Sequence, residues 1–399
     1  MKTMKTIRQL ICPGALVPAF ALTLVSCGGG GGNAPATAPG ITKQNFGQLN
    51  GRPVDLYTLT NTNGIVAKIT TYGGIITELH VPDRNGAPGD IVLGFDRLDG
   101  YLTPAYKKNN PYFGALIGRY CTRITKGQFT LDNTHYQLTP NDGPNHLHGG
   151  ASGFNTKLWT ARPIPRSDAN SLELTLTSPD GDEGYPGTLH VTVTYTLTDA
   201  NELKIDYRAT TDKPTPFNPT NHTYFNLSAG KQPTIASHEL TLPAATYTEM
   251  DDAWLPTGNL APVAGTPMDF TTPQKIGARL HDNYPDLKHD KGGYAHSWIL
   301  DKNTAPGSLA PALAATVYEP ESGRLMEVFT TQPAMHFYAG SYLDGTLTGK
   351  RNITYPQYAG LCLETQHLPD SPNHPAWPTT ILRPGQEFQS QTIFKFSTK

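Results

Sequence analysis

The sequence has little charge and no excess of either sign. Lys and Arg number 31, Asp and Glu number 33, and together they make up 16% of the chain. Three of the basic residues lie in the first 27 positions, which hold no acidic residue, so the net charge of −2 becomes −5 without that segment. Proteins that bind nucleic acid or an anionic membrane surface usually carry a basic excess. We therefore expect neither as a partner.

Cysteine is also scarce, and the motifs of several enzyme classes are missing. Of the four cysteines, only Cys121 and Cys362 lie outside the N-terminal segment. We expect them to be buried free thiols, although an oxidising compartment would permit a disulfide. The chain has no Gly-x-Ser-x-Gly elbow, so serine hydrolysis is unsupported. It has neither a Walker loop nor a dinucleotide fingerprint, and no strand or helix flanks the glycine run 28–32 to make it a phosphate loop.

The apolar run near the N-terminus, from Leu10 to Val25, is too short and too interrupted by proline to be a good membrane-spanning helix. Basic residues precede it, and it ends in Leu24-Val25-Ser26-Cys27, followed by Gly28. This order is typical of a targeting signal, and its end resembles a bacterial lipobox. We expect residues 1–26 to be removed and a lipid to be attached to Cys27. An ordinary secretory signal with an incidental cysteine is the alternative.

This interpretation places the protein on the periplasmic face of a bacterial membrane. Gly28, rather than Asp, follows the lipidated cysteine, which by resemblance to known lipoproteins favours the outer membrane. Residues 27–43 are rich in Gly, Pro and Ala and are expected to form a flexible tether. From position 44 to 399 there is no composition break, repeat or low-complexity segment, so one large domain is predicted. A monomer and a dimer both remain open.

Strand patterns dominate that domain. Apolar residues alternate with polar ones over residues 189–198, a turn follows, and the alternation resumes over 203–207, which predicts a β-hairpin. Residues 172–176 read as a similar strand. The best helical candidate, 272–280, is short. Many strands with turn-rich links and few helices predict an all-β fold, a large antiparallel β-sandwich.

Glu364 lies in an unusually apolar strand pattern, Gly360 to His367. The period of two directs Cys362, Glu364 and Gln366 to one face. A carboxylate in such surroundings is either paired in a salt bridge or used in chemistry. The sequence therefore predicts a partly desolvated acid at the edge of a cleft, with a salt-bridged strand glutamate as the alternative.

Histidines and an arginine upstream favour the chemical role. His222 follows a proline-rich extended stretch, and alternation would place His146 and His148 on one face before two glycines. Two such histidines can bind zinc, but no third ligand has metal-site spacing, so we expect no metal. Arg123 can present a fork of donors to hydroxyl groups. These residue types suit acid–base chemistry on a neutral polyhydroxylated ligand, whereas a structural histidine and a surface arginine are the alternatives.

Short motifs at these and other positions occur along the chain in one order. Three of them are Leu147-His148-Gly149-Gly150, Thr220-Asn221-His222 and Leu363-Glu364-Thr365-Gln366, and the others occupy residues 71–74, 81–86, 93–96, 112–119, 178–181, 183–187, 255–258, 331–333, 343–346 and 382–385. Through them the chain, from about residue 44 to its end, resembles the aldose 1-epimerase (galactose mutarotase) family. The resemblance implies a β-supersandwich that interconverts the α and β anomers of free monosaccharides such as galactose and glucose, with neither cofactor nor metal.

The resemblance also implies roles for residues. Glu364 matches the general base, His222 the general acid, His148 a second active-site histidine and Arg123 a substrate-binding arginine. A carboxylate with an ordinary pKa near 4 and an imidazole with one near 6.5 would be available as base and acid at neutral pH.

Three substrate-contact positions depart from the family pattern. Ala295 stands where the family has a sugar-binding aspartate, and Asp290 is a nearby candidate to replace it. His336 stands in place of a glutamine and Thr122 in place of an asparagine. We expect these changes to shift sugar preference rather than to abolish ring opening. Three alternatives remain: a non-catalytic carbohydrate-binding lipoprotein, a hexose-6-phosphate epimerase, and a secreted polysaccharide lyase or hydrolase on a related sandwich.

Overall fold

The alternating stretches form the strands that the sequence predicts. The computed structural model describes residues 39–165, 167–288, 291–301 and 309–399. Leu189–Thr198 (β13) and Glu202–Thr211 (β14) pair as an antiparallel hairpin, with Leu197 opposite Leu203 beside the turn. The signal segment, Cys27 and most of the tether lie outside the described residues. Gly40–Leu49 (β1) already pairs with Arg52–Thr60 (β2), so strand structure begins inside the range assigned to the tether.

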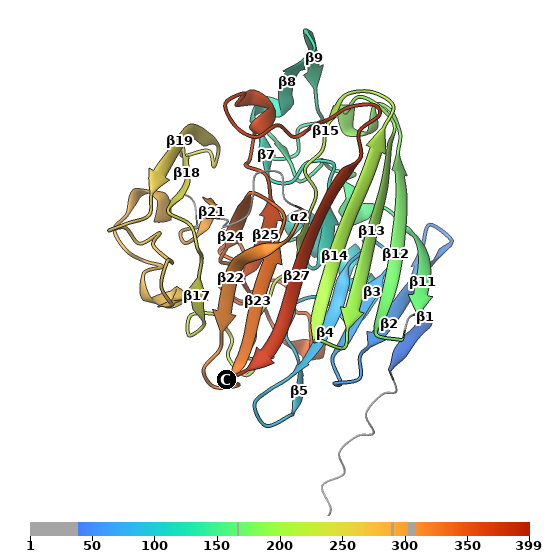
Figure 1. The fold of residues 1–399 in the computed structure, drawn as a ribbon, viewed down its shortest axis with the longest axis vertical. Coiled ribbons are helices and arrows are strands. Elements are labelled where there is room, and N and C mark those ends of the chain that lie inside the picture. The colour runs from blue at the N-terminus through green and yellow to red at the C-terminus, as the bar shows by residue number, and fades with distance from the viewer. Residues whose placement is uncertain (1–38, 166, 289–290, 302–308) are drawn as a thin grey trace, which may run out of the picture. The chain divides into compact units, whose positions relative to one another are not determined.

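A nine-stranded sheet forms one layer of the sandwich, and its long strands stand at the front of Figure 1. Its strand order is β11-β12-β13-β14-β27-β23-β22-β17-β20. The strands not yet bounded are Thr160–Pro165 (β11), Ala169–Ser178 (β12), Phe388–Thr398 (β27), Arg324–Thr330 (β23), Ala312–Tyr318 (β22), Glu239–Thr241 (β17) and Gln274–Lys275 (β20).

Two five-stranded sheets complete the main framework. The first has the order β1-β2-β3-β4-β5 and includes Val66–Thr70 (β3), Ile76–Pro82 (β4) and Pro88–Asp90 (β5). The second has the order β19-β18-β21-β24-β25 and consists of Pro256–Pro262 (β19), Thr246–Met250 (β18), Ala295–Ile299 (β21), Ala334–Tyr338 (β24) and Cys362–Gln366 (β25). The second sheet carries Ala295, His336, Tyr338 and Glu364, four of the residues that line the candidate site.

Four short two-stranded sheets lie within the connecting segments. They are Ala115–Ile117 (β6) with Thr220–His222 (β16), Arg123–Ile124 (β7) with His146–Leu147 (β10), Gln128–Leu131 (β8) with Thr134–Gln137 (β9), and Thr215–Pro216 (β15) with Ile381–Leu382 (β26). The β8–β9 hairpin projects at the top of Figure 1.

The helices are short, as the abundance of Gly and Pro favours. The α-helices are Leu98–Leu102 (α1) and Pro104–Asn109 (α2), and the 3-10 turns are Thr125–Gly127, Phe154–Thr156, Asp182–Gly184, Ile276–Ala278, Pro285–Leu287, Lys350–Asn352 and Ser371–Asn373. The helix predicted at 272–280 is wrong: β20 and a single 3-10 turn occupy this range. Gly277 there packs so closely on Ala236 that a Cβ would lie 2.7 Å from its methyl group.

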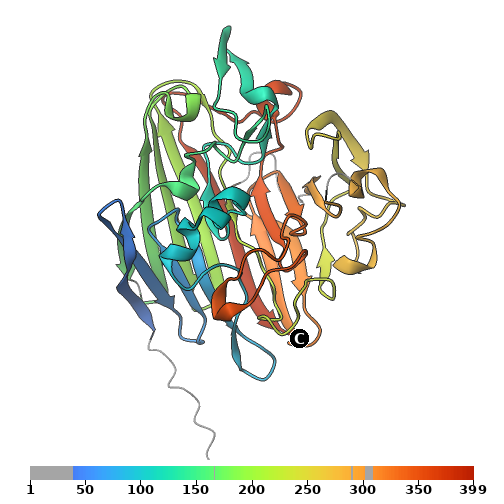
Figure 2. The same cartoon turned by 180° about the vertical axis from the view of Figure 1, so that it is seen from behind.

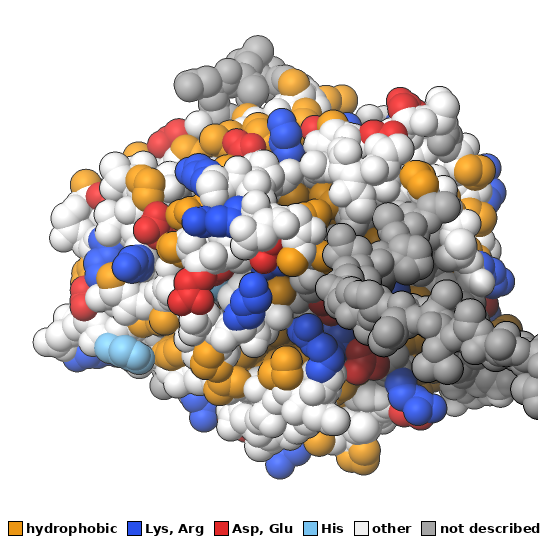
Figure 3. Space-filling model, turned by 90° about the horizontal axis from the view of Figure 1, so that it is seen from below, with side chains coloured by type: hydrophobic (Ala, Val, Ile, Leu, Met, Phe, Trp, Pro, Cys, Tyr) orange, Lys and Arg blue, Asp and Glu red, His pale blue; other side chains and the backbone are white. Residues whose placement is uncertain are grey.

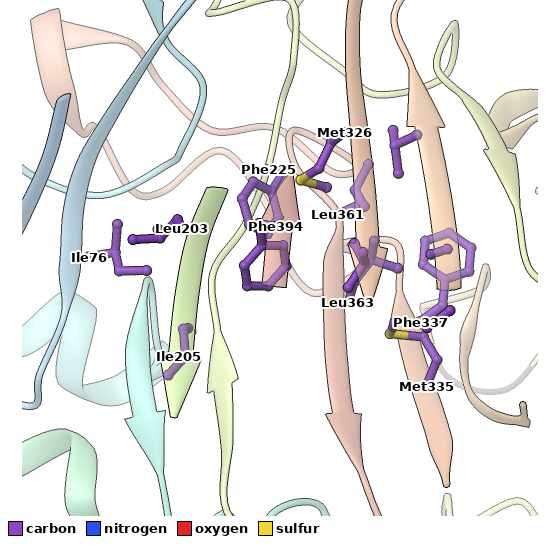
Figure 4. Close-up of a cluster of buried hydrophobic side chains, with 14 of the residues drawn as sticks. Ile76, Leu203, Ile205, Phe225, Met326, Met335, Phe337, Leu361, Leu363 and Phe394 are labelled. Atoms are coloured by element: carbon purple, nitrogen blue, oxygen red, sulfur yellow. The ribbon is translucent and has the colours of Figure 1, made fainter. Parts of the chain in front are cut away.

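The hydrophobic core lies between the layers. Figure 4 shows Phe225 against Phe394 of β27, with Leu363 of β25 and Phe337 of β24 nearby. Burial of each such side chain contributes about 1.5–3 kcal/mol. The reverse view in Figure 2 shows the short helices and loops on the side of the sandwich away from the long strands. This arrangement leaves the outward side chains of β24 and β25 under a layer of loops.

The surface agrees with the balanced composition. On the face seen in Figure 3, acidic and basic side chains are interspersed. Among the described residues, none of the helices has the length and apolar character needed to cross a bilayer.

Candidate active site

Glu364 is placed by the alternation of β25. The strand directs Leu363 into the core and Glu364 to the opposite face, where its side chain is 1% exposed. On the neighbouring strand β24, His336 lies directly across from Glu364, and on β21 Ser297 lies across from His336. The prediction of an acid on this face is confirmed, and burial is more complete than the predicted position at a cleft edge.

His222 is brought to Glu364 by the pairing of β16. Ala115 of β6 pairs with His222 of β16. The hydroxyl of Thr220, also on β16, donates to the carbonyl of Thr365. Beyond β16, Phe225 and Leu361 exchange two backbone hydrogen bonds of 2.7 and 2.9 Å. These contacts hold Nε2 of His222 3.5 Å from Oε1 of Glu364. The two residues are 142 positions apart in the chain, and they meet as the sequence motifs suggested.

His148 reaches the same place from a loop. It follows β10 with a positive φ of 51°, and the next residue, Gly149, has so little room that a Cβ would lie 1.8 Å from a backbone oxygen. The N–H of Thr122 donates to Nδ1 of His148, and the N–H of His148 donates to the carbonyl of Thr122. This pair of bonds fixes the ring, whose centroid lies 5.2 Å from that of His222.

The prediction that His146 and His148 share a face is wrong. The left-handed backbone at His148 ends the alternation after Leu147. His146 instead contacts the carbonyl of Thr139 and the hydroxyl of Tyr185, at 2.7 and 2.8 Å, in a separate cluster. Only His148 therefore belongs to the site.

Two of the predicted sugar contacts lie at the site and one serves another purpose. Arg123, on β7, lines the cleft and forms an ion pair of 2.6 Å with Asp142. His336 also lines the cleft, with Nδ1 2.9 Å from the hydroxyl of Ser297. Thr122 is 4% exposed, and its hydroxyl donates to the carbonyl of Cys121. Its side chain therefore has a local partner, and its backbone orients His148.

The position that departs most from the family pattern also lies in the cleft. Ala295 begins β21 and is among the lining residues, opposite Tyr338 of β24. Asp290, its candidate replacement, lies outside the described residues. The aromatic residues of β21 and β24 lie on two different faces. Trp298 and Phe337 lie in the core, whereas Tyr338 lines the cleft.

The cleft itself has a volume of about 540 Å³, enough to enclose a small ligand. Strand residues form its floor: Glu364, His336, His222, Ala295 and Tyr338. Its mouth is formed by Lys107 to Asn109 of α2 and by loop residues, which are Asn110 to Tyr112, Asn141, Asp142, Trp254 and Tyr342 to Asp344. The base and acid candidates are therefore buried beneath a polar opening formed by α2 and loops.

Two lining residues were missed from the sequence. Tyr112 packs against both histidines, with ring centroids 4.7 Å from His148 and 5.7 Å from His222. Trp254 has a positive φ of 58° and is 5% exposed. Tyr112 opens the 112–119 motif and could have been selected on that basis. Trp254 directly precedes the 255–258 motif and could have been selected in the same way.

Burial dominates the electrostatics. It raises the pKa of Glu364 to about 8 and lowers the pKa of His222 to about 4. Burial, followed by the neighbouring positive charges of His222 and Arg123, also lowers the pKa of His148 and brings that of His336 to about 3. The expectation of ordinary pKa values for the acid and base is therefore wrong for the free protein, because desolvation favours the neutral form of each. Burial therefore favours the form of the pair in which Glu364 holds the exchangeable proton and His222 is neutral.

Ligand atoms of His148, His222 and Glu364 lie within 4.8 Å of one another, a spacing that a metal ion could bridge. The hydrogen bond from Thr122 opposes this. A metal on Nδ1 of His148 would displace the N–H of Thr122. A metal on Nε2 would move the ring proton to Nδ1, where it would face that same N–H. The donor set therefore suits hydrogen bonding to a ligand better than metal binding.

Comparisons with known proteins point to one family. The family model for aldose 1-epimerase matches residues 55–395. Galactose mutarotase of Homo sapiens is 44% identical over 359 residues, which cover 90% of this chain and 98% of that protein. Aldose 1-epimerase of Escherichia coli (strain K12) is 37% identical, with 87% of this chain and 96% of that protein covered.

A solved structure resembles the fold over the same extent. The crystal structure of galactose 1-epimerase from Lactobacillus acidophilus NCFM superposes with a TM-score of 0.77 at 30% identity, covering 90% of this chain and 99% of that one. The match to the family model includes the strands that carry the buried carboxylate and histidine. This chain belongs to the aldose 1-epimerase family of isomerases.

Proposed function

We propose that the protein interconverts the α and β anomers of free hexoses, galactose and glucose among them, with Glu364 as general base and His222 as general acid. The observation that carries this proposal is the buried pair itself, 3.5 Å apart on the floor of a cleft of about 540 Å³. Carboxyl and imidazole groups placed this closely can exchange protons with two neighbouring oxygens of one ligand.

Ring opening needs two proton transfers. Glu364 takes the proton of the anomeric hydroxyl O1, and the O1 electrons form the C1=O1 double bond. The C1–O5 bond breaks, its electron pair goes to the ring oxygen O5, and Nε2–H of His222 protonates O5. Rotation about C1–C2 presents the other face of the aldehyde, and the same transfers in reverse close the ring. The sugar gains and loses no atoms, and the pair keeps one proton throughout.

The resting protonation state is compatible with this cycle. The free pair holds its proton on Glu364, and the reacting pair needs it on His222. Both states carry the same number of protons and the same net charge. A bound sugar donates from O1 to the carboxylate and accepts at O5 from the imidazolium, and both bonds favour the ionised pair. Sugar binding therefore shifts the proton towards His222.

The remaining groups bind and orient the sugar. Because Nδ1 of His148 accepts from Thr122, the proton of its neutral ring lies on Nε2, which makes it a donor to a sugar oxygen. Arg123, held by Asp142, offers its guanidinium to hydroxyls at the cleft wall. His336 offers Nε2 beside Glu364, since Ser297 occupies its Nδ1.

Polarimetry tests the proposal. Freshly dissolved α-D-galactose and α-D-glucose are followed with residues 39–399 and with the Glu364→Gln variant. We expect acceleration by the parent protein that collapses in the variant. No acceleration over spontaneous mutarotation, on these sugars or on xylose and arabinose, would favour the carbohydrate-binding alternative. Release of reducing ends from a polymer would favour the lyase or hydrolase.

A hexose-6-phosphate is the second candidate substrate. Lys107 and Lys108 at the mouth of the cleft favour a phosphate there, but Asp142 and Asp344 line the same cleft and oppose it. Glucose 6-phosphate, added as a competitor to the galactose assay, separates the two: strong competition would support the phosphorylated substrate.

The N-terminal sequence supports a location for this activity. The basic residues, the apolar run and the lipobox occur in the order of a lipoprotein signal, so the mature chain begins at a lipidated Cys27 on the periplasmic face of the membrane. Labelled palmitate should be incorporated into the parent and not into Cys27→Ala. A chain that fractionates with the soluble periplasm in both cases would contradict the anchor.

A further inference from the structure

Cys362 is a buried thiol that the proposed reaction does not use. It lies on β25 two residues before Glu364, and therefore on the same face of the strand. Its Sγ lies 3.5 Å from Nδ1 of His222, while Oε1 of Glu364 lies 3.5 Å from Nε2 of the same ring. One strand thus contacts both nitrogens of the imidazole.

We propose that Cys362 is a positioning residue that keeps a proton on Nδ1 of His222 and so leaves Nε2 as the nitrogen that exchanges its proton with the sugar. The proposal rests on the acid role proposed for His222. In that role Nε2 gives its proton to O5 on ring opening and takes it back on closure, while Nδ1–H stays in place.

The alternative tautomer cannot perform this cycle. A neutral imidazole carries one proton. If that proton lies on Nε2, the nitrogen has no lone pair with which to accept from Glu364 or from the sugar. Giving that proton to O5 would leave an imidazolate anion in a buried site, which is costly. An acceptor at Nδ1 that holds the useful tautomer therefore supports both directions of the reaction.

Sulfur suits this position because it is a weak acceptor without charge. A carboxylate at Nδ1 would also hold the tautomer, but its charge would stabilise the imidazolium and make it a poorer acid. Burial raises the pKa of the Cys362 thiol well above its usual range, so the sulfur remains neutral. The thiol thus leaves protonated His222 ready to give its proton to O5.

The other groups around the ring are neutral. The rings of Tyr112, Tyr224, Tyr338 and His148 surround His222 at centroid distances of 5.7, 5.2, 6.3 and 5.2 Å. Burial raises the pKa of each of these tyrosines and lowers that of His148, so they are uncharged at neutral pH. The polar contacts of the ring are therefore Glu364 at Nε2, Cys362 at Nδ1 and a hydrogen bond with the backbone of His222 itself, and Cys362 is the side chain that contacts Nδ1.

Two substitutions and a matched control test the proposal. Cys362→Ala removes the acceptor, Cys362→Ser replaces it with a stronger one, and Cys121→Ala removes the other buried free thiol of residues 39–399. The readouts are the ¹⁵N NMR signals of labelled histidine, with those of His222 identified by comparison with His222→Asn, and the pH profile of kcat/KM.

We expect the parent to carry its His222 proton on Nδ1. In Cys362→Ala the Nε2–H tautomer should become populated, and kcat should fall roughly tenfold with little change in KM, as for other groups that orient a reacting side chain. Cys362→Ser should keep the tautomer and move the acidic limb of kcat/KM to higher pH. Cys121→Ala should match the parent in both readouts.

Two results would overturn the proposal. One is a parent protein with its His222 proton on Nε2. The other is a pair of Cys362 variants with the parent tautomer and pH profile, whose activity falls only with the folded fraction, because Cys362 would then be a packing residue. The NMR readout needs no turnover, so a parent without mutarotase activity would refute the proposed function while the tautomer could still be measured.

Discussion

Asp90 and Glu364 are both buried carboxylates, yet their surroundings are opposite. Asp90 accepts hydrogen bonds from the backbone N–H groups of Leu79 and Val92 and from the buried ammonium of Lys350. Glu364 has Nε2 of His222 at 3.5 Å, and within the described residues its Oε2 has no hydrogen-bond partner. A buried charge is stable only when it is paired. The fold supplies the hydrogen-bond partners of Asp90, whereas Oε2 of Glu364 remains available to a ligand.

The largest expected effect is on activity at the incomplete carboxylate. Glu364→Gln keeps the shape of the side chain and removes its ability to take a proton, so kcat should fall by roughly 10²–10⁴. Polarimetry on α-D-galactose measures this. The fold should not weaken, because an amide replaces a group that burial disfavours in its charged form.

The matching stability measurement is a thermal melt at pH 9. The pKa of Glu364 is about 8 in the folded state, which is above the ordinary value of 4.5. The folded state therefore loses stability as the pH rises from the ordinary value to the folded one. Glu364→Gln lacks this loss and should melt at the same temperature as the parent or higher. A variant that melts well below the parent at pH 9 would contradict the account of an incomplete carboxylate.

Asp90→Asn should show the reverse pattern, a loss of stability without a loss of activity. The substitution leaves the ammonium of Lys350 buried without its counter-charge, which costs roughly 3–5 kcal/mol of unfolding free energy. Urea unfolding measures that loss, and activity per folded molecule should match the parent. The double variant Asp90→Asn, Lys350→Met should recover part of the stability. If the single variant were as stable as the parent, Asp90 would not be a carboxylate that stabilises the fold.

The pH profile gives a third contrast. The active pair holds one proton, and with a pKa of about 4 for His222 and about 8 for Glu364 that state predominates between these values. We expect kcat/KM to be level across this range and to fall about tenfold per pH unit outside it. Ordinary pKa values would instead give a decline above pH 6.5. A decline that begins there would show that the pair is hydrated in solution.

The smallest expected effect concerns sugar preference. Ala295→Asp adds a carboxylate at the cleft wall, where it can accept from a sugar hydroxyl, an interaction worth about 1–3 kcal/mol. The ratio of kcat/KM among galactose, glucose and xylose should change while the pH profile stays the same. Ala295→Asn is a control of the same size without charge. Unchanged ratios in Ala295→Asp would show that this position does not determine specificity.

The sandwich could be predicted because its signals are local. Alternation gave the β13–β14 hairpin and the faces of β25, and the ordered motifs placed Glu364 and His222 in one site. The failures arise where the backbone departs from regular structure. The positive φ at His148 separates it from His146, and close packing on Ala236 replaces the helix expected around Gly277.

Electrostatics and loops were harder to predict for a related reason. The pKa values depend on how completely Glu364 and His222 are removed from water, which no spacing in the sequence reveals. Trp254 reaches the cleft from a local turn, in which the N–H groups of Trp254 and Leu255 donate to Asp251. Thr122 was expected to contact sugar through its side chain, and it acts through its backbone N–H instead.

The division of the cleft into a strand floor and a loop mouth has a consequence for how the protein can change. The distance between Glu364 and His222 is set by backbone pairing, including the two bonds between Phe225 and Leu361. The residues at the mouth of the cleft belong to α2 and to separate loops. Insertions and exchanges in those loops can therefore retune which sugars are admitted while the proton-transfer distance is inherited unchanged, so recognition and chemistry can evolve, or be engineered, independently.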